Sequence, residues 1–545
     1  GEIQSPDVVM KNKSTTIYGN IVAFDQSPVN KDLLYVGTDD GLIQVSTDGG
    51  KTWNKKENFP GVPSLTYVNM VWASQHDENV VYAAFNNHKR GDFKPYILKS
   101  TDKGNSWASI SNDLPERGNV YSVAEDHVDA NLLFAGTEFG CYVSVNGGGN
   151  WVELSSGLPT IAVRDMAIQK RENDLVLGTF GRGFYVLDDY SPLRNMKEED
   201  LNADAKIFPI KTALEYVEAQ PFGLRGTAGQ GHSMYSAPNP DFGATFTYFV
   251  KDKPKSPKEI RQESEKKAKE AGEDIDYPTH EEFVKEDNYE DAYLLFVVKD
   301  ANGNEVRKIR KSASTGIKRV TWNLRYPAVT PIRLKKGQTG RYSNPNEGPL
   351  ALPGKYTVEL WQADNGTMKK LSNPVGFEVK ALENSSLERQ TEANMAFKKE
   401  VQELRRKIRG SGNEQSELDT RLSHIKAAIQ YYPGADLVWM EEVKALEKLS
   451  HDIGIDMWGD YHKSRRDVET VPGTGSRVEN IVWNTWYSTS DPTTTNKEQL
   501  ELAKEEYTSI RSRLDDFRAR VIALESKLDS KNIPYTPNRP NWKED

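Results

Sequence analysis

Residues 46–53 read STDGGKTW, and residues 100–107 read STDKGNSW. The two stretches carry Ser, Asp, Gly, a hydroxyl residue and Trp at the same offsets, and residues 144–151 (SVNGGGNW) repeat the pattern with Asn in place of Asp. A repeat of about 50 residues with several short strands in each unit is typical of β-propeller blades. The residues that carry it are Ser46, Asp48, Gly50, Thr52 and Trp53, then Ser100, Asp102, Gly104, Ser106 and Trp107, then Ser144, Asn146, Gly148 and Trp151.

Four segments align on this repeat: residues 19–53, 66–107, 118–151 and 161–189. Each has apolar runs separated by polar turns, which predicts strands A to D, numbered from the propeller axis outward. In the first segment we expect strand A near 21–24, strand B at 33–38, strand C at 42–46 and strand D after Trp53. The octapeptide is then the C–D turn. Because the strands are antiparallel, B–C turns and D–A links share the opposite face, called the B–C face below.

The octapeptide has a sufficient structural explanation. Its Asp can accept backbone N–H bonds within the turn, its Gly allows a positive φ, and its Trp can pack between sheets. We prefer this role to direct chemistry, because the third copy has Asn146 where the others have Asp. A turn tolerates that exchange better than a catalytic carboxylate would.

The pattern S-x-D-x-G-x-[ST]-W resembles the Asp-box, or bacterial neuraminidase repeat. The stretch LGTFGRGFYVLDDYSPLR (177–194) is similar to the terminal blade of large exported bacterial proteins that are labelled "glycosyl hydrolase" and have a sortilin-like propeller. In those proteins a β-sandwich and a helical region follow. The resemblance implies an exported protein in the periplasm, at the outer membrane or outside a Gram-negative cell. The resemblance leaves catalytic activity open, because Asp-boxes occur in sialidases and xyloglucanase-type glycosidases and also in sortilin ectodomains and non-catalytic assembly factors.

Four blades are few for a closed propeller, and an unclosed one exposes a sheet face and strand edges. Members of the resembled family are usually longer on the N-terminal side. We therefore expect residues 1–195 to be the last blades of a larger propeller, with the other blades upstream or on another chain. Gly1 is not an initiating Met and no signal peptide precedes it, which indicates a processed protein or a piece of a longer one.

The rest of the chain predicts two further domains. Residues 205–382 contain runs that predict strands, among them VTWNLRY (320–326) and LPGKYTVEL (352–360). This pair resembles the immunoglobulin-like modules of exported bacterial proteins, which implies one β-sandwich. A charged stretch at 251–288 interrupts it and is either a solvated helical excursion or a docking arm. Residues 383–545 have helical periodicity and predict a bundle. A capping box at Ser385 and Glu388 would start its first helix, and the GSG at 410–412 would break it. We expect a polar loop at 469–492 and a long helix from Thr495.

Composition excludes several classes of function. The net charge of −9 argues against general nucleic-acid binding, and no apolar run of 18 or more residues exists to span a membrane. The single cysteine, Cys141, allows no internal disulfide, which fits the cytosol or an exported bacterial protein that does without them. The eight histidines are scattered and form no metal-binding motif, so we expect no metal and no cofactor.

A glycosidase needs two carboxylates that flank the scissile bond. On the B–C face the candidates are Asp39, Asp40 and Glu138, and Arg182 could hold an anionic group there. The alternative is ordinary turn chemistry, since TDDG makes a good turn without catalysis. The insertion NNHKRGDFKPY (86–96) enlarges the same face, and His88, Lys89 and Arg90 make it a candidate recognition loop or plain surface variation.

These observations support two hypotheses. The first is an exported, non-catalytic binding or scaffold protein that joins a cell-envelope complex or binds a polymeric ligand, with a protein partner expected and a glycan as the other option. The second is a glycoside hydrolase that acts on a polysaccharide or glycan across the propeller face. We prefer the first, because no acid–base pair stands out in the sequence.

Overall fold

The computed structural model describes residues 19–218, 237–332, 347–383 and 389–539. The predicted capping box at Ser385 and Glu388 lies outside these ranges. By its contacts the chain divides into two units, one comprising the residues up to Pro209 with Phe249–Lys251 and the other the remainder.

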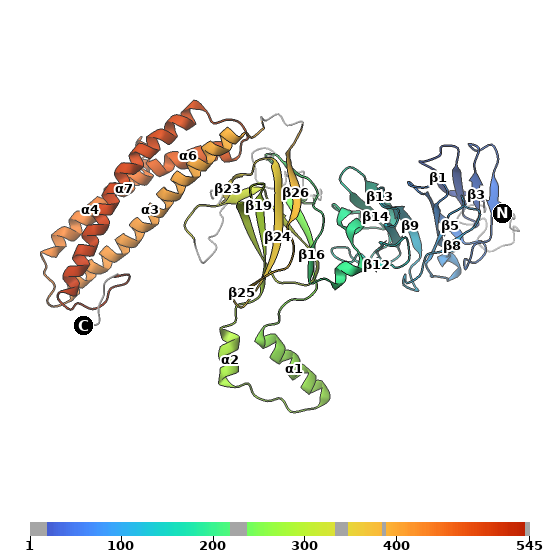
Figure 1. The fold of residues 1–545 in the computed structure, drawn as a ribbon, viewed down its shortest axis with the longest axis horizontal. Helices are drawn as coiled ribbons and strands as arrows, with labels where there is room; N and C mark the ends of the chain where they lie inside the picture. The colour runs from blue at the N-terminus through green and yellow to red at the C-terminus, as the bar shows by residue number, and fades with distance from the viewer. Residues whose placement is uncertain (1–18, 219–236, 333–346, 384–388, 540–545) are drawn as a thin grey trace. The chain divides into compact units, whose positions relative to one another are not determined.

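The first unit consists of four small antiparallel sheets that resemble propeller blades (Figure 1). We call them blades 1 to 4 in chain order. The first three have four strands in sequence order, as the repeat predicts, whereas blade 4 has three and lacks the predicted strand D among the described residues. The strands are β1 (Ile21–Gln26), β2 (Leu34–Thr38), β3 (Ile43–Ser46) and β4 (Asn54–Lys56); β5 (Tyr67–Ala73), β6 (Val81–Asn86), β7 (Tyr96–Ser100) and β8 (Ala108–Ser109); β9 (Val120–Glu125), β10 (Leu133–Thr137), β11 (Cys141–Ser144) and β12 (Val152–Glu153); and β13 (Val163–Gln169), β14 (Asp174–Thr179) and β15 (Phe184–Leu187). The short strand β16 (Ala205–Ile207) follows.

The core of this unit lies between consecutive sheets. One buried apolar cluster joins blades 1 and 2, a second joins blades 2 and 3, and a third joins blades 3 and 4. Strands in the middle blades are buried on both faces, which explains runs such as VYAAFN in β6, where every residue is buried. Successive side chains along a strand point to opposite faces of the sheet. One strand of a middle blade therefore packs against both the preceding and the following blade. Each blade corresponds to one sequence repeat, whereas each apolar cluster is formed by residues of two consecutive blades.

The second unit begins with a curled mixed sheet. Strands β17, β26, β24, β19 and β20 lie in that order, with β25 beside β24, and only the β17–β26 pair is parallel. Phe246 on β18 packs against Phe296 and Phe377 of the large sheet, with ring centroids 6.4 and 5.4 Å away. The bounds are β17 (Ala213–Glu215), β18 (Ala244–Val250), β19 (Tyr293–Asp300), β20 (Glu305–Ser312), β21 (Gly316–Trp322), β22 (Arg325–Pro327), β23 (Glu347–Leu350), β24 (Gly354–Asp364), β25 (Thr367–Lys370) and β26 (Val375–Ala381).

The charged stretch at 251–288 forms two helices, α1 (Pro257–Ala271) and α2 (His280–Asp287). Both start with a capping box, from Ser256 and Thr279, and neither has a buried residue. Arg261 bridges them through a pair of hydrogen bonds to Glu286, 2.6 and 2.9 Å long. The predicted helical excursion is therefore present, and its role as a docking arm stays a prediction.

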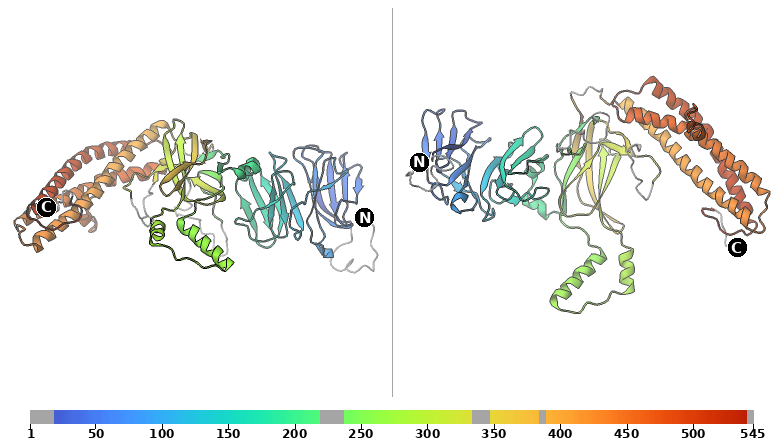
Figure 2. Two further views of the ribbon diagram at one scale, coloured as in Figure 1. Left: turned by 60° about the horizontal axis from the view of Figure 1, so that its bottom comes forward. Right: turned by 180° about the vertical axis from the view of Figure 1, so that it is seen from behind.

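The helical region consists of α3 (Glu392–Tyr431), α4 (Trp439–Trp458), the one-turn α5 (Tyr461–Ser464), α6 (Thr474–Trp486) and α7 (Thr494–Asp529). Figure 2 shows the two longest helices, α3 and α7, running side by side in both views. A single apolar cluster extends through α3, α4, α6 and α7.

Two sequence-based predictions in this region are wrong. The glycines of GSG do not break the first helix, because α3 continues through residues 410–412. The Ser411 hydroxyl lies 2.9 Å from that of Tyr507, and Gly412 lies against the Trp458 ring, where a Cβ would come within 3.0 Å. This packing compensates for the helix propensity that two glycines forfeit, about 1 kcal/mol each. The expected polar loop at 469–492 contains α6, whose Trp486 is fully buried.

Within the described ranges, no helix has both the length and the apolar composition needed to cross a bilayer. The same part of the chain contains no cluster of three His, Cys, Asp or Glu side chains suited to a metal ion.

Candidate functional site

The octapeptide forms the C–D turn, as predicted, and its polar groups bond to one another. In the first copy the Ser46 hydroxyl accepts the Gly50 N–H at 2.8 Å and donates to Asp48 Oδ1 at 2.8 Å. Asp48 also accepts the Thr52 N–H and hydroxyl, at 2.9 and 2.6 Å. The Trp53 indole N–H donates to the Gly50 carbonyl at 3.0 Å. The Asp48 carboxylate thus accepts its hydrogen bonds from residues of its own turn.

The second and third copies have nearly the same geometry. Asp102 accepts the Ser106 N–H and hydroxyl at 2.7 and 2.6 Å. Asn146 accepts the Ser144 hydroxyl at 2.9 Å and the N–H of Asn150 at 2.9 Å, so an amide oxygen replaces the carboxylate without loss of the turn. The octapeptide glycines have φ of +88°, +79° and +92° at Gly50, Gly104 and Gly148, the left-handed region expected from the sequence.

These hydrogen bonds change the acidity of the turn. The hydroxyl and N–H of Thr52 hold the pKa of Asp48 at about 2, below its usual 3.8. Ser106 has the same effect on Asp102, whose pKa is also about 2. Groups this acidic are poor proton donors or acceptors near neutral pH. The turns therefore favour a structural role.

The candidate carboxylates of blade 1 lie on the B–C face, in the β2–β3 turn. Asp39 Oδ1 accepts the N–H groups of Gly19 and Asn20 at 2.8 and 3.0 Å, and its Oδ2 accepts the Asn20 side-chain amide at 2.9 Å. Asp40 is buried and accepts the Thr38 hydroxyl at 2.5 Å. Both residues therefore serve the local fold, by holding the start of β1 and the turn itself.

Glu138 lies in the equivalent turn of blade 3 and is half-buried. Its carboxylate accepts the hydroxyl of Tyr121, a residue of the adjacent strand β9. Burial and this hydrogen bond raise the pKa of Tyr121 to about 12. Asp39 and Glu138 thus occupy equivalent positions two blades apart, as the sequence predicted, but each is engaged by donors of its own blade.

One feature of this face was missed by sequence reasoning. Arg164, on β13, has its guanidinium carbon 3.8 Å from the centroid of the Tyr121 ring and 5.1 Å from that of Phe180. Tyr121 belongs to blade 3, while Phe180 lies in the β14–β15 turn of blade 4, next to the predicted Arg182. Both arginines are exposed. A lone arginine in a strand gives no sequence signal, because its stacking partners come from two different repeats.

The predicted recognition loop forms an exposed 3-10 helix over His88–Arg90. His88 Nδ1 lies 2.5 Å from Asn86 Oδ1, and Arg90 donates to the Ser64 carbonyl at 2.7 Å. The Lys89 ammonium lies 5.8 Å from the centroid of the Tyr67 ring. Blade 2 therefore adds a second pairing of a cation with an aromatic ring to the same face.

The two end blades expose side chains at positions where the equivalent side chains of the other blades are buried. At one register of strand C the four blades carry Ile43, Ile97, Cys141 and Phe184. The first three are fully buried against the next blade, whereas Phe184 is 80% exposed. Among the described residues of the first unit, no further blade covers this side of blade 4.

Blade 1 shows the same difference on its other side. At one register of strand A the blades carry Ile21, Val68, Val120 and Val163, of which Ile21 is 67% exposed and the others fully buried. The exposed fraction of Trp53 is 41%, against 9% for Trp107 and 6% for Trp151. Both end blades thus expose side chains of the type that pack between blades elsewhere in the unit.

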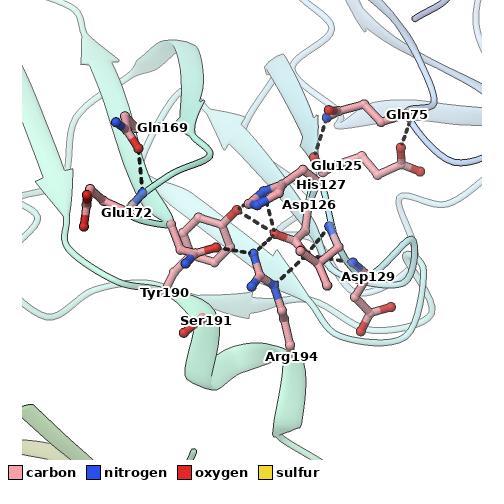
Figure 3. A network of polar contacts seen from close by, with 12 residues as sticks. Gln75, Glu125, Asp126, His127, Asp129, Gln169, Glu172, Tyr190, Ser191 and Arg194 are labelled. Carbon is pink, nitrogen blue, oxygen red and sulfur yellow. Dashed lines mark hydrogen bonds and ion pairs between the residues drawn. The ribbon is translucent and has the colours of Figure 1, made fainter. Parts of the chain in front are cut away.

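On the opposite face, a polar clasp joins blade 3 to the segment that leaves blade 4 (Figure 3). Asp126 follows β9 and is buried; Arg194 donates two hydrogen bonds of 2.7 Å to its carboxylate, and the Tyr190 hydroxyl a third of 2.6 Å. Burial raises the pKa of Asp126, but the hydrogen bonds from Arg194 and Tyr190 outweigh it and the net shift is downward. Tyr190 and Arg194 belong to the stretch that carries the family resemblance, and here they stabilise the fold.

The second unit has a cavity of about 540 Å³ between α3 and α4. Asp419, His451 and His462 are among its lining residues, and burial raises the pKa of Asp419. The two imidazole rings lie 5.8 Å apart and are exposed. No sequence-predicted site residue lies here, so the B–C face of the first unit remains the candidate site.

No family model and no curated protein matches the chain. The structure is similar in part to solved β-propeller proteins of the Asp-box type. YCF48 from Cyanidioschyzon merolae matches with 20% identity and a TM-score of 0.23, over 31% of this chain and 52% of that one. The GH74 enzyme of Niastella koreensis matches with 15% identity and a TM-score of 0.25, over 31% of this chain and 29% of that one.

An ancestral GH74 enzyme matches with 16% identity and a TM-score of 0.25, over 65% of this chain and 40% of that one. The chain therefore spans about half of the YCF48 chain and less than half of each GH74 chain. With TM-scores this low, the similarity supports no statement about activity. What the structure does show is blade-like antiparallel sheets, a curled mixed sheet and a C-terminal helical region.

Proposed function

We propose that this chain is a non-catalytic binding or scaffold protein whose blades bind a ligand through the B–C face. The proposal rests on the difference between the carboxylates of that face and its cationic and aromatic side chains. The candidate carboxylates Asp39 and Glu138 accept hydrogen bonds from their own blades, while Arg164, Phe180 and Lys89 stand exposed to solvent. Exposed aromatic and cationic side chains suit binding, whereas a glycosidase needs two carboxylates free for acid–base chemistry.

The exposed ends of the row of blades support the second part of the proposal. Ile21 and Trp53 on one side, and Phe184 on the other, occupy registers that neighbouring blades bury elsewhere. Burying an aliphatic or aromatic side chain stabilises a fold by about 1.5–3 kcal/mol, so such faces favour further blades. We propose that these blades belong to a larger, sortilin-like propeller, with the other blades upstream or on another chain.

The setting we propose is the envelope of a Gram-negative bacterium, where the protein is exported and acts in an assembly or on a polymeric ligand. The mixed sheet would be an immunoglobulin-like sandwich that acts as a spacer, and the helical region would be a further contact surface. These parts of the proposal rest on the resemblance of the Asp-boxes and of residues 177–194.

The test compares binding with turnover on the full chain. A broad glycan panel is incubated with the protein, and both bound glycan and released product are measured. We expect binding without product, unchanged by Asp39→Asn as long as thermal melting shows an intact fold. Product release that Asp39→Asn or Glu138→Gln abolishes, with the fold intact, would establish a glycoside hydrolase and contradict the proposal.

A further inference from the structure

The Arg164 side chain is held in place by aromatic rings. Its guanidinium carbon lies 3.8 Å from the Tyr121 centroid and 5.1 Å from the Phe180 centroid, and these rings come from consecutive blades. Stacking of a planar guanidinium on an aromatic face orients it without use of its N–H donors. Tyr121 itself is fixed, since it is nearly buried and its hydroxyl donates to Glu138. The guanidinium is therefore positioned before any ligand arrives.

The N–H donors of Arg164 have no acceptor among the residues that the structure describes. In contrast, Arg194 on the opposite face makes a pair of hydrogen bonds to buried Asp126, and Arg261 makes a pair to Glu286. Glu138, which is close to Tyr121, accepts the tyrosine hydroxyl rather than a guanidinium N–H. A fixed guanidinium with free donors matches the two oxygens of a carboxylate.

We infer that the B–C face binds a uronate residue of an acidic polysaccharide, with the carboxylate on Arg164 and the sugar ring on Phe180. This inference rests on the proposed binding function and names its ligand class. Lys89 in blade 2 and Arg182 in blade 4 are also exposed on this face, so a chain with repeated negative charges would meet cations on more than one blade.

The shape of the aromatic surface favours a sugar chain over an acidic peptide. Phe180 is 69% exposed and Phe139, in the β10–β11 turn, is 49% exposed. Both rings are thus largely exposed, and an exposed aromatic ring is a surface on which a pyranose ring can stack. A peptide instead anchors its side chains in well-packed pockets. An acidic peptide is therefore the competing outcome that the experiment must separate.

The experiment measures binding of hexagalacturonate to the full chain by calorimetry, in about 0.1 M salt so that charge interactions are only partly screened. The methyl-esterified hexamer keeps the sugar chain and loses the carboxylate charge, and hexaglutamate supplies the charge without sugar. Arg164→Gln should raise the Kd for hexagalacturonate by about tenfold to a hundredfold, as expected for loss of hydrogen bonds to a charged group. Arg164→Lys should recover only part of the affinity, because lysine keeps the charge and lacks the planar fork.

Arg171→Gln is the matched control. Arg171 is an exposed arginine of the same blade, in the β13–β14 turn on the opposite face. Its replacement changes the net charge equally and should leave the Kd within about twofold of the unaltered chain. Thermal melting of each variant separates loss of binding from loss of folding.

Equal losses for Arg164→Gln and Arg171→Gln would overturn the inference, because the attraction would then be general. Tighter binding of hexaglutamate than of hexagalacturonate would assign the site to acidic peptides instead. If hexagalacturonate does not bind but a neutral glycan binds in a way that Phe180→Ala abolishes, the uronate inference fails and the proposed function stands. Binding that no substitution on the B–C face alters would contradict both.

Discussion

The first and second Asp-boxes form the same turn in different surroundings. In each, a Ser, an Asp and a hydroxyl residue bond to one another, and the Trp indole donates to the Gly carbonyl. The second box packs against the preceding blade, where Val45 lies 3.1 Å from the point that a Gly104 Cβ would occupy, and its Trp107 is buried. The first has no such neighbour among the described residues, and Trp53 stays exposed. The motif thus specifies the turn, while the preceding blade determines whether its tryptophan stabilises the fold.

The largest expected difference follows from the two tryptophans. Trp107→Ala should destabilise the blades by about 3–5 kcal/mol, the usual cost of removing a large buried ring. Trp53→Ala should cost under about 1 kcal/mol, because its ring is already partly in water. Urea unfolding followed by far-ultraviolet circular dichroism measures both. Similar losses for the two variants would mean that Trp53 is covered in solution, and would point to a blade seated on it.

The register comparison at strand C gives the second prediction. Ile97→Ala should cost about 2–5 kcal/mol of unfolding free energy, because the side chain fills the space between blades 2 and 3. Phe184→Ala, at the same register of blade 4, should change that free energy by about 0.5 kcal/mol or less. The same unfolding assay applies. A cost for Phe184→Ala that approaches the cost for Ile97→Ala would show that this end of the row is also packed.

The glycines of the boxes give a smaller effect. Gly50 and Gly104 both have a positive φ, so an alanine at either position costs about 1 kcal/mol of backbone strain. Gly104→Ala should cost more, because its Cβ would press on Val45 of the preceding blade, whereas the nearest atom to a Cβ at Gly50 is 3.5 Å away, on Leu34. Melting temperatures of the two variants test this order. Equal shifts would show that contact between the blades adds nothing at this position.

The smallest expected effect is a change in melting temperature at low pH. The folded pKa of Asp48 and of Asp102 is about 2, below the ordinary 3.8. Ionised, these carboxylates stabilise their turns above pH 3.8, and this contribution declines as the pH falls from 3.8 toward 2. Asn146 in the third box does not titrate. The melting temperature of Asp102→Asn should therefore fall less between pH 4 and pH 2 than that of the unaltered chain. A parallel fall would show that Asp102 is not responsible.

The sequence predicted those features that are encoded within one repeat. The order of the strands, the C–D position of the octapeptide and the positive φ of its glycines all follow from spacing and turn chemistry, and the structure confirms them. Asp39 and Glu138 were also placed correctly on equivalent turns. Their hydrogen bonds were not predicted, because the donors lie about 20 residues away along the chain.

The features that were missed depend on contacts between distant segments. Arg164 becomes a site residue only because Tyr121 and Phe180 meet it from two repeats. The helix α3 continues through its glycines because Trp458 and Tyr507, from two other helices, pack there. Local propensity gives the wrong answer at such positions, because tertiary packing supplies the larger free energy.

The clasp around Asp126 determines how the blades respond to pulling. Its carboxylate holds five hydrogen bonds, two from Arg194, one from Tyr190 and two from backbone N–H groups of its own turn. Tension that enters from residue 195 onward meets Arg194 and Tyr190 before it reaches β15, the last strand of blade 4. We expect the load to pass to blade 3, so that β15 peels from its sheet only after the hydrogen bonds of the clasp have broken.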